Sequence, residues 1–119
     1  MKKINIVKKN RDFSRIIKNN RPIKSNLFVI YLEKNTNDIY KFGISASKKV
    51  GNAVTRNRVK RQIKSILDKN IYKNNFNCII IIKKDIIDKS FDEMSKDLNI
   101  LINKLNIKEI KWKRKYWYY

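Results

Sequence analysis

Three arginines stand close together in the chain and could bind phosphates or the edges of nucleobases. Arg56, Arg58 and Arg61 lie within six residues, although the chain has only seven arginines in all. Positive charge alone does not explain this grouping, because lysine is far more common here, with 23 residues. Only arginine presents a planar fork that binds a phosphate or a guanine edge through two hydrogen bonds and also stacks on bases. The run therefore predicts contacts with nucleic acid.

Polar and basic neighbours extend these arginines into a larger candidate surface for nucleic acid. The predicted members are Lys48, Lys49, Asn52, Arg56, Asn57, Arg58, Lys60, Arg61 and Lys64. Apolar residues recur among them at Val59, Ile63 and Ile66, which is the one-face spacing of an amphipathic helix, so most of the basic side chains fall on the other face. A solvated surface is the alternative interpretation, because runs of charge usually face solvent.

The loop before this helix suits an anion. Both glycines of the chain, Gly43 and Gly51, lie in the strand and loop that precede the helix, where backbone freedom or close approach matters. The loop itself, residues 47–52, offers backbone amides, a hydroxyl and two ammonium groups. Cations in the first turn of a helix oppose its dipole, by about 0.3–1 kcal/mol each when exposed, whereas a phosphate is favoured there. We therefore expect an anion near the start of the helix.

The overall charge also favours a polyanionic partner. With 30 basic and 10 acidic residues among 119, the chain has a net charge of +20 and a pI near 10.2. Such a charge repels itself in isolation, so nucleic acid is the first candidate partner. No apolar run approaches the ~20 residues that span a membrane, and no signal-peptide core follows the first residues. We expect a cytoplasmic protein without membrane contact.

The residue types that are missing exclude most protein-based catalysis. The chain has no histidine and a single cysteine, Cys78, within an apolar run where a buried thiol is expected. The commonest general base, the usual triads and histidine-rich metal sites are therefore unavailable. We predict no catalytic residue and no metal or other cofactor held by the protein itself. A nuclease made of protein alone would have to use Asp, Glu, Lys or Tyr.

Two further helices are predicted to flank the basic helix. The first runs from an N-cap at Asn10 to about Asn19, and it places Phe13 and Ile17 on one face. The last begins at a capping box at Ser90 and carries a stripe of methionine and leucine, which is expected to pack on the sheet. The first nine residues resemble a basic, flexible arm with some strand character.

The strands are predicted from β-branched and aromatic residues between turn signals. Leu27–Glu33 and Ile39–Ala46 are expected to pair as a hairpin, and Cys78–Ile82 is a short buried strand after the basic helix. We find no repeat or linker that would divide the chain. The predicted organisation is a basic arm (1–9), one RNA-binding α/β domain (10–106) and a basic, aromatic tail (107–119).

The run from Gly43 to Arg61 resembles a family signature. A K-K-x-G-N-A-V loop followed by R-N-R-x-[KR]-R is the hallmark of the protein subunit of bacterial ribonuclease P. The resemblance implies a small α+β sandwich of order αβββαβα with a central mixed sheet, including a short extra strand near Ile23–Ser25. It also implies a left-handed β-α-β crossover around the basic helix, although such crossovers are right-handed in about 98% of cases. We follow the family on this point.

The resemblance also implies a function and a second site. In this family a large RNA cleaves precursor tRNA at the mature 5′ end using Mg²⁺, while the small protein binds that RNA and the single-stranded 5′ leader of the substrate. The implied partners are the catalytic RNA and precursor tRNA. The leader cleft is expected at Phe13, Ile17, Tyr31, Ser45 and Ser47. Ile17 stands where some relatives carry an aromatic residue, and helical spacing alone would assign Phe13 to the core.

Two other classes of function fit the same charge and size. A ribosomal protein or general RNA chaperone would need no leader cleft, and a protein-only nuclease would cleave RNA without an RNA partner. The tail lies beyond the resemblance and interleaves aromatic with basic side chains. Its rings either pack back on the domain or stack on unpaired bases as a second RNA contact.

Overall fold

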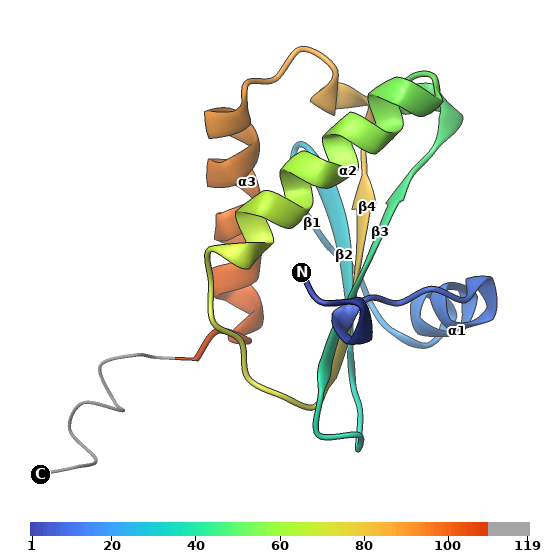
Figure 1. The fold of residues 1–119 in the computed structure, drawn as a ribbon, viewed down its shortest axis with the longest axis vertical. Coiled ribbons are helices and arrows are strands. Elements are labelled where there is room, and N and C mark those ends of the chain that lie inside the picture. The colour runs from blue at the N-terminus through green and yellow to red at the C-terminus, as the bar shows by residue number, and fades with distance from the viewer. Residues whose placement is uncertain (110–119) are drawn as a thin grey trace, which may run out of the picture.

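A computed structural model describes residues 1–109, and its elements follow the predicted order αβββαβα. The helices and strands are α1 (Asn10–Asn19), β1 (Ile23–Lys24), β2 (Phe28–Lys34), β3 (Tyr40–Ala46), α2 (Ala53–Asp68), β4 (Phe76–Ile82) and α3 (Phe91–Leu105). Short 3-10 turns precede α1, α2 and α3 (Figure 1). The small α+β fold that we predicted is confirmed, including the two-residue strand β1. Most of the predicted tail lies outside the described residues.

The four strands form one mixed sheet in the order β1-β2-β4-β3. β4 pairs along its whole length with both neighbours, antiparallel to β2 and parallel to β3. The expected hairpin pairing of β2 with β3 is therefore wrong. β4 takes the place between them because its apolar residues are buried on both faces, which only a central strand allows. Asn75 joins the two separated strands instead, since it accepts a hydrogen bond from Asn35 and donates one to Ile39.

The crossover from β3 through α2 to β4 is left-handed. In Figure 1 both strands point upward and α2 lies in front of the sheet. The chain leaves β3, passes through α2 and enters β4, which lies to the left of β3 in this view. The general rule for such units predicts the opposite hand. The expectation drawn from the family resemblance is confirmed.

Two hydrophobic clusters pack on the two faces of the sheet. Alternate residues of β4 serve each of them, since Cys78, Ile80 and Ile82 face α2 and α3, whereas Ile79 and Ile81 face α1. The cluster beneath α2 and α3 is the larger one. Burial in it raises the pKa of the Cys78 thiol, which leaves that group protonated and unreactive at neutral pH, as expected for a core cysteine.

Local caps fix the start of both long helices. The Asn52 side chain accepts a hydrogen bond from the Thr55 amide at 2.9 Å and so begins α2. Ser90 accepts from the Glu93 amide at 3.1 Å, which confirms it as the N-cap of α3. The Glu93 carboxylate accepts from the Ser90 hydroxyl at 3.3 Å, whereas a full capping box would have it accept from the Ser90 backbone N–H. α1 differs from the prediction, because its N-cap is Lys9 rather than Asn10 and no side chain caps it.

The first residues are held against the domain rather than free. The Met1 amino group lies 2.8 Å from the Asp68 carboxylate, and the Asn5 side chain donates to the Tyr40 carbonyl at 2.7 Å. The Val7 amide then bonds the carbonyl of Phe42 in β3 at 2.9 Å. The expected strand character is limited to a single parallel bridge there. This segment therefore lies along β3 and helps to shape the face that α1 covers.

Candidate nucleic-acid interface

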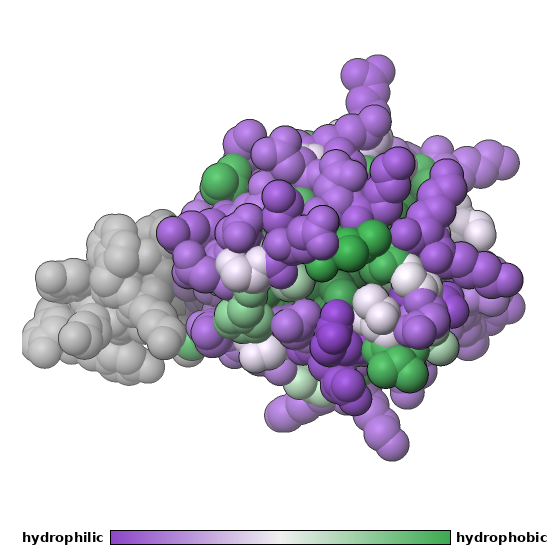
Figure 2. Space-filling view, turned by 90° about the horizontal axis from the view of Figure 1, so that it is seen from above, coloured by the Kyte–Doolittle hydropathy of each residue, from purple (hydrophilic) through white to green (hydrophobic). Residues whose placement is uncertain are grey.

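The outer face of α2 carries the predicted arginines. Val59 and Ile63 are buried beneath the helix, whereas Arg58 and Arg61 on its other side are exposed. Among the described residues, none of the basic side chains of α2 forms an ion pair with a carboxylate. Hydrophilic residues also cover most of the molecular face that is drawn in Figure 2. The helix thus presents positive charge that no described acidic residue neutralises.

The other predicted members of this surface divide into exposed and half-buried positions. The exposed ones are Lys48, Lys49, Asn52 and Asn57, and the half-buried ones are Arg56, Lys60 and Lys64. Arg56 has a buried Nε without a hydrogen-bond partner, the single such side-chain atom within residues 1–109. Leaving a buried donor unpaired costs about 1–3 kcal/mol, more when the group is charged. Arg56 is therefore the member of the set that gains most from a partner.

The two glycines have the properties that the sequence indicated, unusual backbone freedom at Gly51 and close approach of a neighbour at Gly43. Gly51 adopts φ of 149°, a left-handed conformation that side chains rarely take. Gly43 instead permits close approach, because a Cβ there would lie 2.6 Å from Cζ of Phe13 and 2.7 Å from Cδ1 of Ile79. The Phe13 ring therefore lies directly against the backbone of β3.

Phe13 and Tyr31 are partly buried and pack against the same small cluster of buried residues on the α1 face, Val7, Ile16 and Ile79. Tyr31 of β2 and Gly43 of β3 both pair with Ile79 of the central strand, so the two rings lie on either side of that residue. Both rings are partly exposed, as is Ile17 beside them. The interpretation of Phe13 as a fully buried core residue is excluded, because part of its surface remains open to a ligand.

A groove of about 470 Å³ runs between α1 and the edge of β3. Its lining residues are Val7, Lys8, Asn10, Phe13, Ser14, Ile17, Ile44, Ser45 and Lys60. Three residues of the expected cleft, Phe13, Ile17 and Ser45, thus meet Lys60 from the basic helix. Tyr31 and Ser47 do not line this groove: Tyr31 lies farther across the sheet, and Ser47 caps the turn before α2 by accepting from the Lys49 amide.

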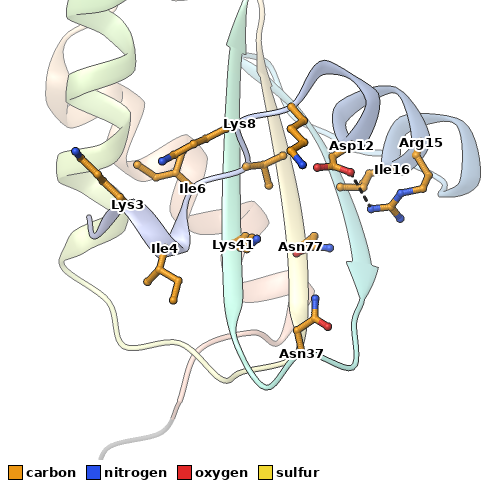
Figure 3. Close-up of a pocket in the computed structure, with 12 residues that line it drawn as sticks. Lys3, Ile4, Ile6, Lys8, Asp12, Arg15, Ile16, Asn37, Lys41 and Asn77 are labelled. Carbon is orange, nitrogen blue, oxygen red and sulfur yellow. Dashed lines mark ion pairs between the residues drawn. The ribbon is translucent and has the colours of Figure 1, made fainter.

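A second hollow, of about 390 Å³, lies on the other side of Phe13 and includes residues that our reasoning from the sequence missed. Lys41 and Asn77 lie on neighbouring strands, while Asp12 and Arg15 come from α1 (Figure 3). The sequence did carry one signal for Lys41: it lies two residues before Gly43 on the same strand, so both face the same side of the sheet. The lysines of the first nine residues could not be placed without knowing that this segment docks on β3.

An ion pair at the edge of this hollow neutralises one of the cations that line it. Arg15 bonds the Glu33 carboxylate, which also accepts from the Asn77 side chain at 2.9 Å. The hydrogen bond from Arg15 lowers the pKa of Glu33, against a smaller opposing effect of burial. This carboxylate therefore remains ionised and paired at neutral pH, and it neutralises Arg15 alone among the cations nearby.

A sequence model described as Ribonuclease P matches residues 1–106. The chain belongs to the ribonuclease P protein family. The ribonuclease P protein component of Mycoplasma capricolum is 43% identical over 114 residues, covering 93% of this chain and 100% of that protein. That of Mesoplasma florum is 39% identical, covering 86% and 96%. The resemblance of the arginine motif is thus confirmed.

Solved structures of the family share the fold. The ribonuclease P protein of Staphylococcus aureus has a TM-score of 0.78 and 30% identity, covering 88% of this chain and 98% of that one. The protein of Thermotoga maritima has a TM-score of 0.75 and 26% identity, covering 82% and 94%. The mixed sheet described above is therefore the ribonuclease P protein fold.

Within residues 1–109 no group of three or more histidine, cysteine, aspartate or glutamate side chains is placed to hold a metal ion. None of the helices in the same range combines the length and apolarity that crossing a bilayer requires.

The contact between Gly43 and Phe13 gives a testable prediction. Gly43→Ala should lower the free energy of unfolding by about 1–3 kcal/mol, because the new methyl group overpacks the Phe13 ring and Ile79. Chemical denaturation measures this change, and NMR signals of the Phe13 ring report its displacement. Ser45→Ala, two residues along the same face of β3, is the matched control and should leave both nearly unchanged. Unaltered Phe13 signals in Gly43→Ala would contradict the contact.

Proposed function

We propose that this protein is the RNA-binding subunit of ribonuclease P, the ribonucleoprotein that removes the 5′ leader from precursor tRNA by endonucleolytic cleavage. The observation that carries the proposal is the meeting of two surfaces at Lys60, where the cationic face of α2 adjoins a groove lined by Phe13. One surface suits the backbone of a folded RNA, and the other suits an unpaired strand. Membership of the family supports the same assignment.

The cationic face of α2 is the proposed contact with the catalytic RNA. Arg58 and Arg61 lie one turn apart, so their forks point to the same side and can bind neighbouring phosphates. Neither has a carboxylate partner among the described residues, so no ion pair within them has to break when RNA binds. Binding would release counterions from the RNA and depend strongly on salt.

The groove on the α1 face is the proposed contact with the leader of precursor tRNA. Bases of an unpaired strand would stack on the exposed part of Phe13, and on Tyr31 where the strand crosses the sheet, at about 1–3 kcal/mol for each stacked base. Ser45 offers a hydroxyl to base edges, Ile17 offers an apolar side, and Lys60 attracts the phosphates. Mature tRNA has no leader and would lose these contacts. The protein would thereby favour substrate over product.

The chemistry is assigned to the RNA partner. We propose that the protein contributes no catalytic residue, that Mg²⁺ is used by the RNA subunit, and that the complex works in the cytoplasm. The chain has no histidine to serve as a general base, which supports this division. Cations of α2 would replace part of the screening by metal ions and lower the Mg²⁺ concentration that the RNA needs.

Reconstitution tests this division of labour. The protein alone should cleave nothing, whereas addition of its cognate RNA should restore leader removal at low Mg²⁺, measured as release of the leader from labelled precursor tRNA. Metal-dependent cleavage by RNA-free protein would instead favour a protein-only nuclease. If the protein sedimented with ribosomes and failed to activate the RNA, a ribosomal protein or general RNA chaperone would be the better assignment.

Removing the exposed arginines should weaken assembly without unfolding the domain. Arg58→Ala and Arg61→Ala should each lower the affinity for the catalytic RNA. Each lost phosphate contact should also make the slope of log K against log salt concentration shallower by about 0.7–0.9. Filter binding over a range of salt concentrations measures both. Arg21→Ala, an exposed arginine outside α2, is the matched control. Unchanged salt dependence in both α2 variants would assign this face to solvent.

Removing the Phe13 ring should affect precursor tRNA selectively. Phe13→Ala in the holoenzyme should weaken precursor binding by the worth of about one stacked base, 1–3 kcal/mol, and leave mature tRNA nearly unaffected. Phe13→Leu keeps apolar packing and separates stacking from folding, while Phe91→Ala removes an exposed ring on α3 as a control. Equal losses for both tRNAs would argue against the leader groove.

A further inference from the structure

A network of polar side chains crosses the sheet on the face that α1 covers. Arg15 of α1 bonds one oxygen of the Glu33 carboxylate on β2, and Asn77 of β4 donates to the other oxygen at 2.9 Å. Asn35, the residue after β2, donates to the Asn77 side chain at 3.0 Å and to the Ile39 carbonyl at 3.2 Å. The network therefore links α1 to β2, to β4 and to the turn that leads into β3.

Partial burial distinguishes this network from the other ion pairs of residues 1–109. The Glu33 side chain is 17% exposed and Asn77 is 9% exposed, whereas the carboxylates of the other pairs are 39–75% exposed. Exposed pairs hold their geometry poorly, because water competes and both side chains stay mobile. Asp12, which lies 3.8 Å from Arg15 (Figure 3), belongs to α1 itself and cannot tie the helix to the sheet. Glu33 is therefore the group that holds Arg15 on the sheet.

Arg15 and Phe13 lie on opposite flanks of the buried side of α1. At about 100° per residue, Ile16 falls between them, and it is fully buried in the small cluster beneath the helix. Arg15 reaches β2 on one flank, and Phe13 contacts Gly43 of β3 on the other. A rotation of α1 about its own axis moves both side chains together. Fixing Arg15 therefore fixes the position of the Phe13 ring.

Apolar surface on this face favours a different rotation of α1. The half-buried side chains around the cluster are Phe13, Ile17, Tyr31 and Ile81. Burying more of their surface is favourable, so a helix without its link to Glu33 can roll toward β3 and bury it. That motion would narrow the groove that Phe13 and Ile17 line. The bond between Arg15 and Glu33 opposes it.

We propose that Glu33 and Asn77 are positioning residues for leader binding, which hold Arg15 and thereby fix the rotation of α1 that keeps the Phe13 ring open to an unpaired strand of RNA. None of these three residues lines the groove, so they act through Phe13. The role rests on the proposed leader binding and deepens it. Discrimination between precursor and mature tRNA then depends on a contact outside the groove.

A double-mutant cycle tests this role in the holoenzyme. The variants are Glu33→Gln, Arg15→Ala and the two together, and the double variant keeps the net charge of the wild type. Asp92→Asn removes one negative charge from an exposed ion pair on α3 and is the matched control for Glu33→Gln. Affinities for precursor tRNA and mature tRNA are measured by filter binding. Nuclear Overhauser effects between the Phe13 ring and the Gly43 α-protons report the position of α1, and circular dichroism melts verify folding.

We expect all three variants to lose the same precursor affinity, about three- to tenfold, because each breaks the same contact. Mature tRNA should bind as it does to the wild type, and the Phe13–Gly43 signals should weaken. A purely electrostatic role predicts something else. Glu33→Gln would then tighten the binding of every RNA, Arg15→Ala would weaken it, and the double variant would return to wild-type affinity.

The electrostatic pattern, or unchanged Phe13–Gly43 signals, would overturn the positioning role. So would equal losses for precursor and mature tRNA, which would make the network a general support of the fold. Arg15 is 47% exposed, so Arg15→Ala provides a folded variant even if Glu33→Gln melts below the assay temperature. Normal precursor binding in the cycle, while Phe13→Ala still weakens it, would leave the leader groove standing without this role. Normal binding by Phe13→Ala would overturn both.

Discussion

The fold depends on burying both faces of β4. This strand is almost wholly apolar, so it needs a helical layer on each side and a neighbour on each edge. With β4 between β2 and β3, a right-handed crossover would have placed α2 on the face that α1 covers. The left-handed path instead puts α2 and α3 together over the larger cluster. Among residues 1–109, the other face is covered by α1 and the N-terminal segment alone, which leaves room for the groove and the hollow.

Charge is distributed unevenly over this framework. Half of the ten acidic residues lie between positions 85 and 97, at the turn before α3 and in its first half. Several of them are used there, as Asp92 pairs with Lys96 and Asp97 accepts hydrogen bonds from Ser25 and Leu27. The outer face of α2 and the α1 side keep cations with little compensation. A polyanion would therefore meet the protein in a preferred orientation.

The sequence predicted the features that depend on local order. The cap at Ser90 and the exposed arginines of α2 follow from spacing within one element, and the structure has them where expected. The predicted pairing of β2 with β3 was wrong because strands from distant parts of the chain compete for the same neighbour. The short turn after β2 could not reveal that β4 takes the place between β2 and β3.

Contacts between distant segments were also beyond the sequence. The hollow needs lysines from the first nine residues beside Lys41, and an aromatic cluster joins Tyr40 and Phe42 of β3 to Tyr72 and Phe76. Burial in that cluster raises the pKa of Tyr72, whose hydroxyl donates to the Leu67 carbonyl at 2.7 Å. Nothing in the spacing of these residues indicates their meeting.

The central position of β4 also governs how the chain can fold during its synthesis. Within residues 1–109, β4 is the last strand to leave the ribosome, and β2 and β3 have no other described sheet partner of useful length. Both helical layers therefore wait for the final third of the chain, and contacts of such long range favour slow folding. Until then the basic segment of α2 emerges without its core. A nascent chain of this protein would therefore expose the cations of α2 before the fold that arranges them on one surface has formed.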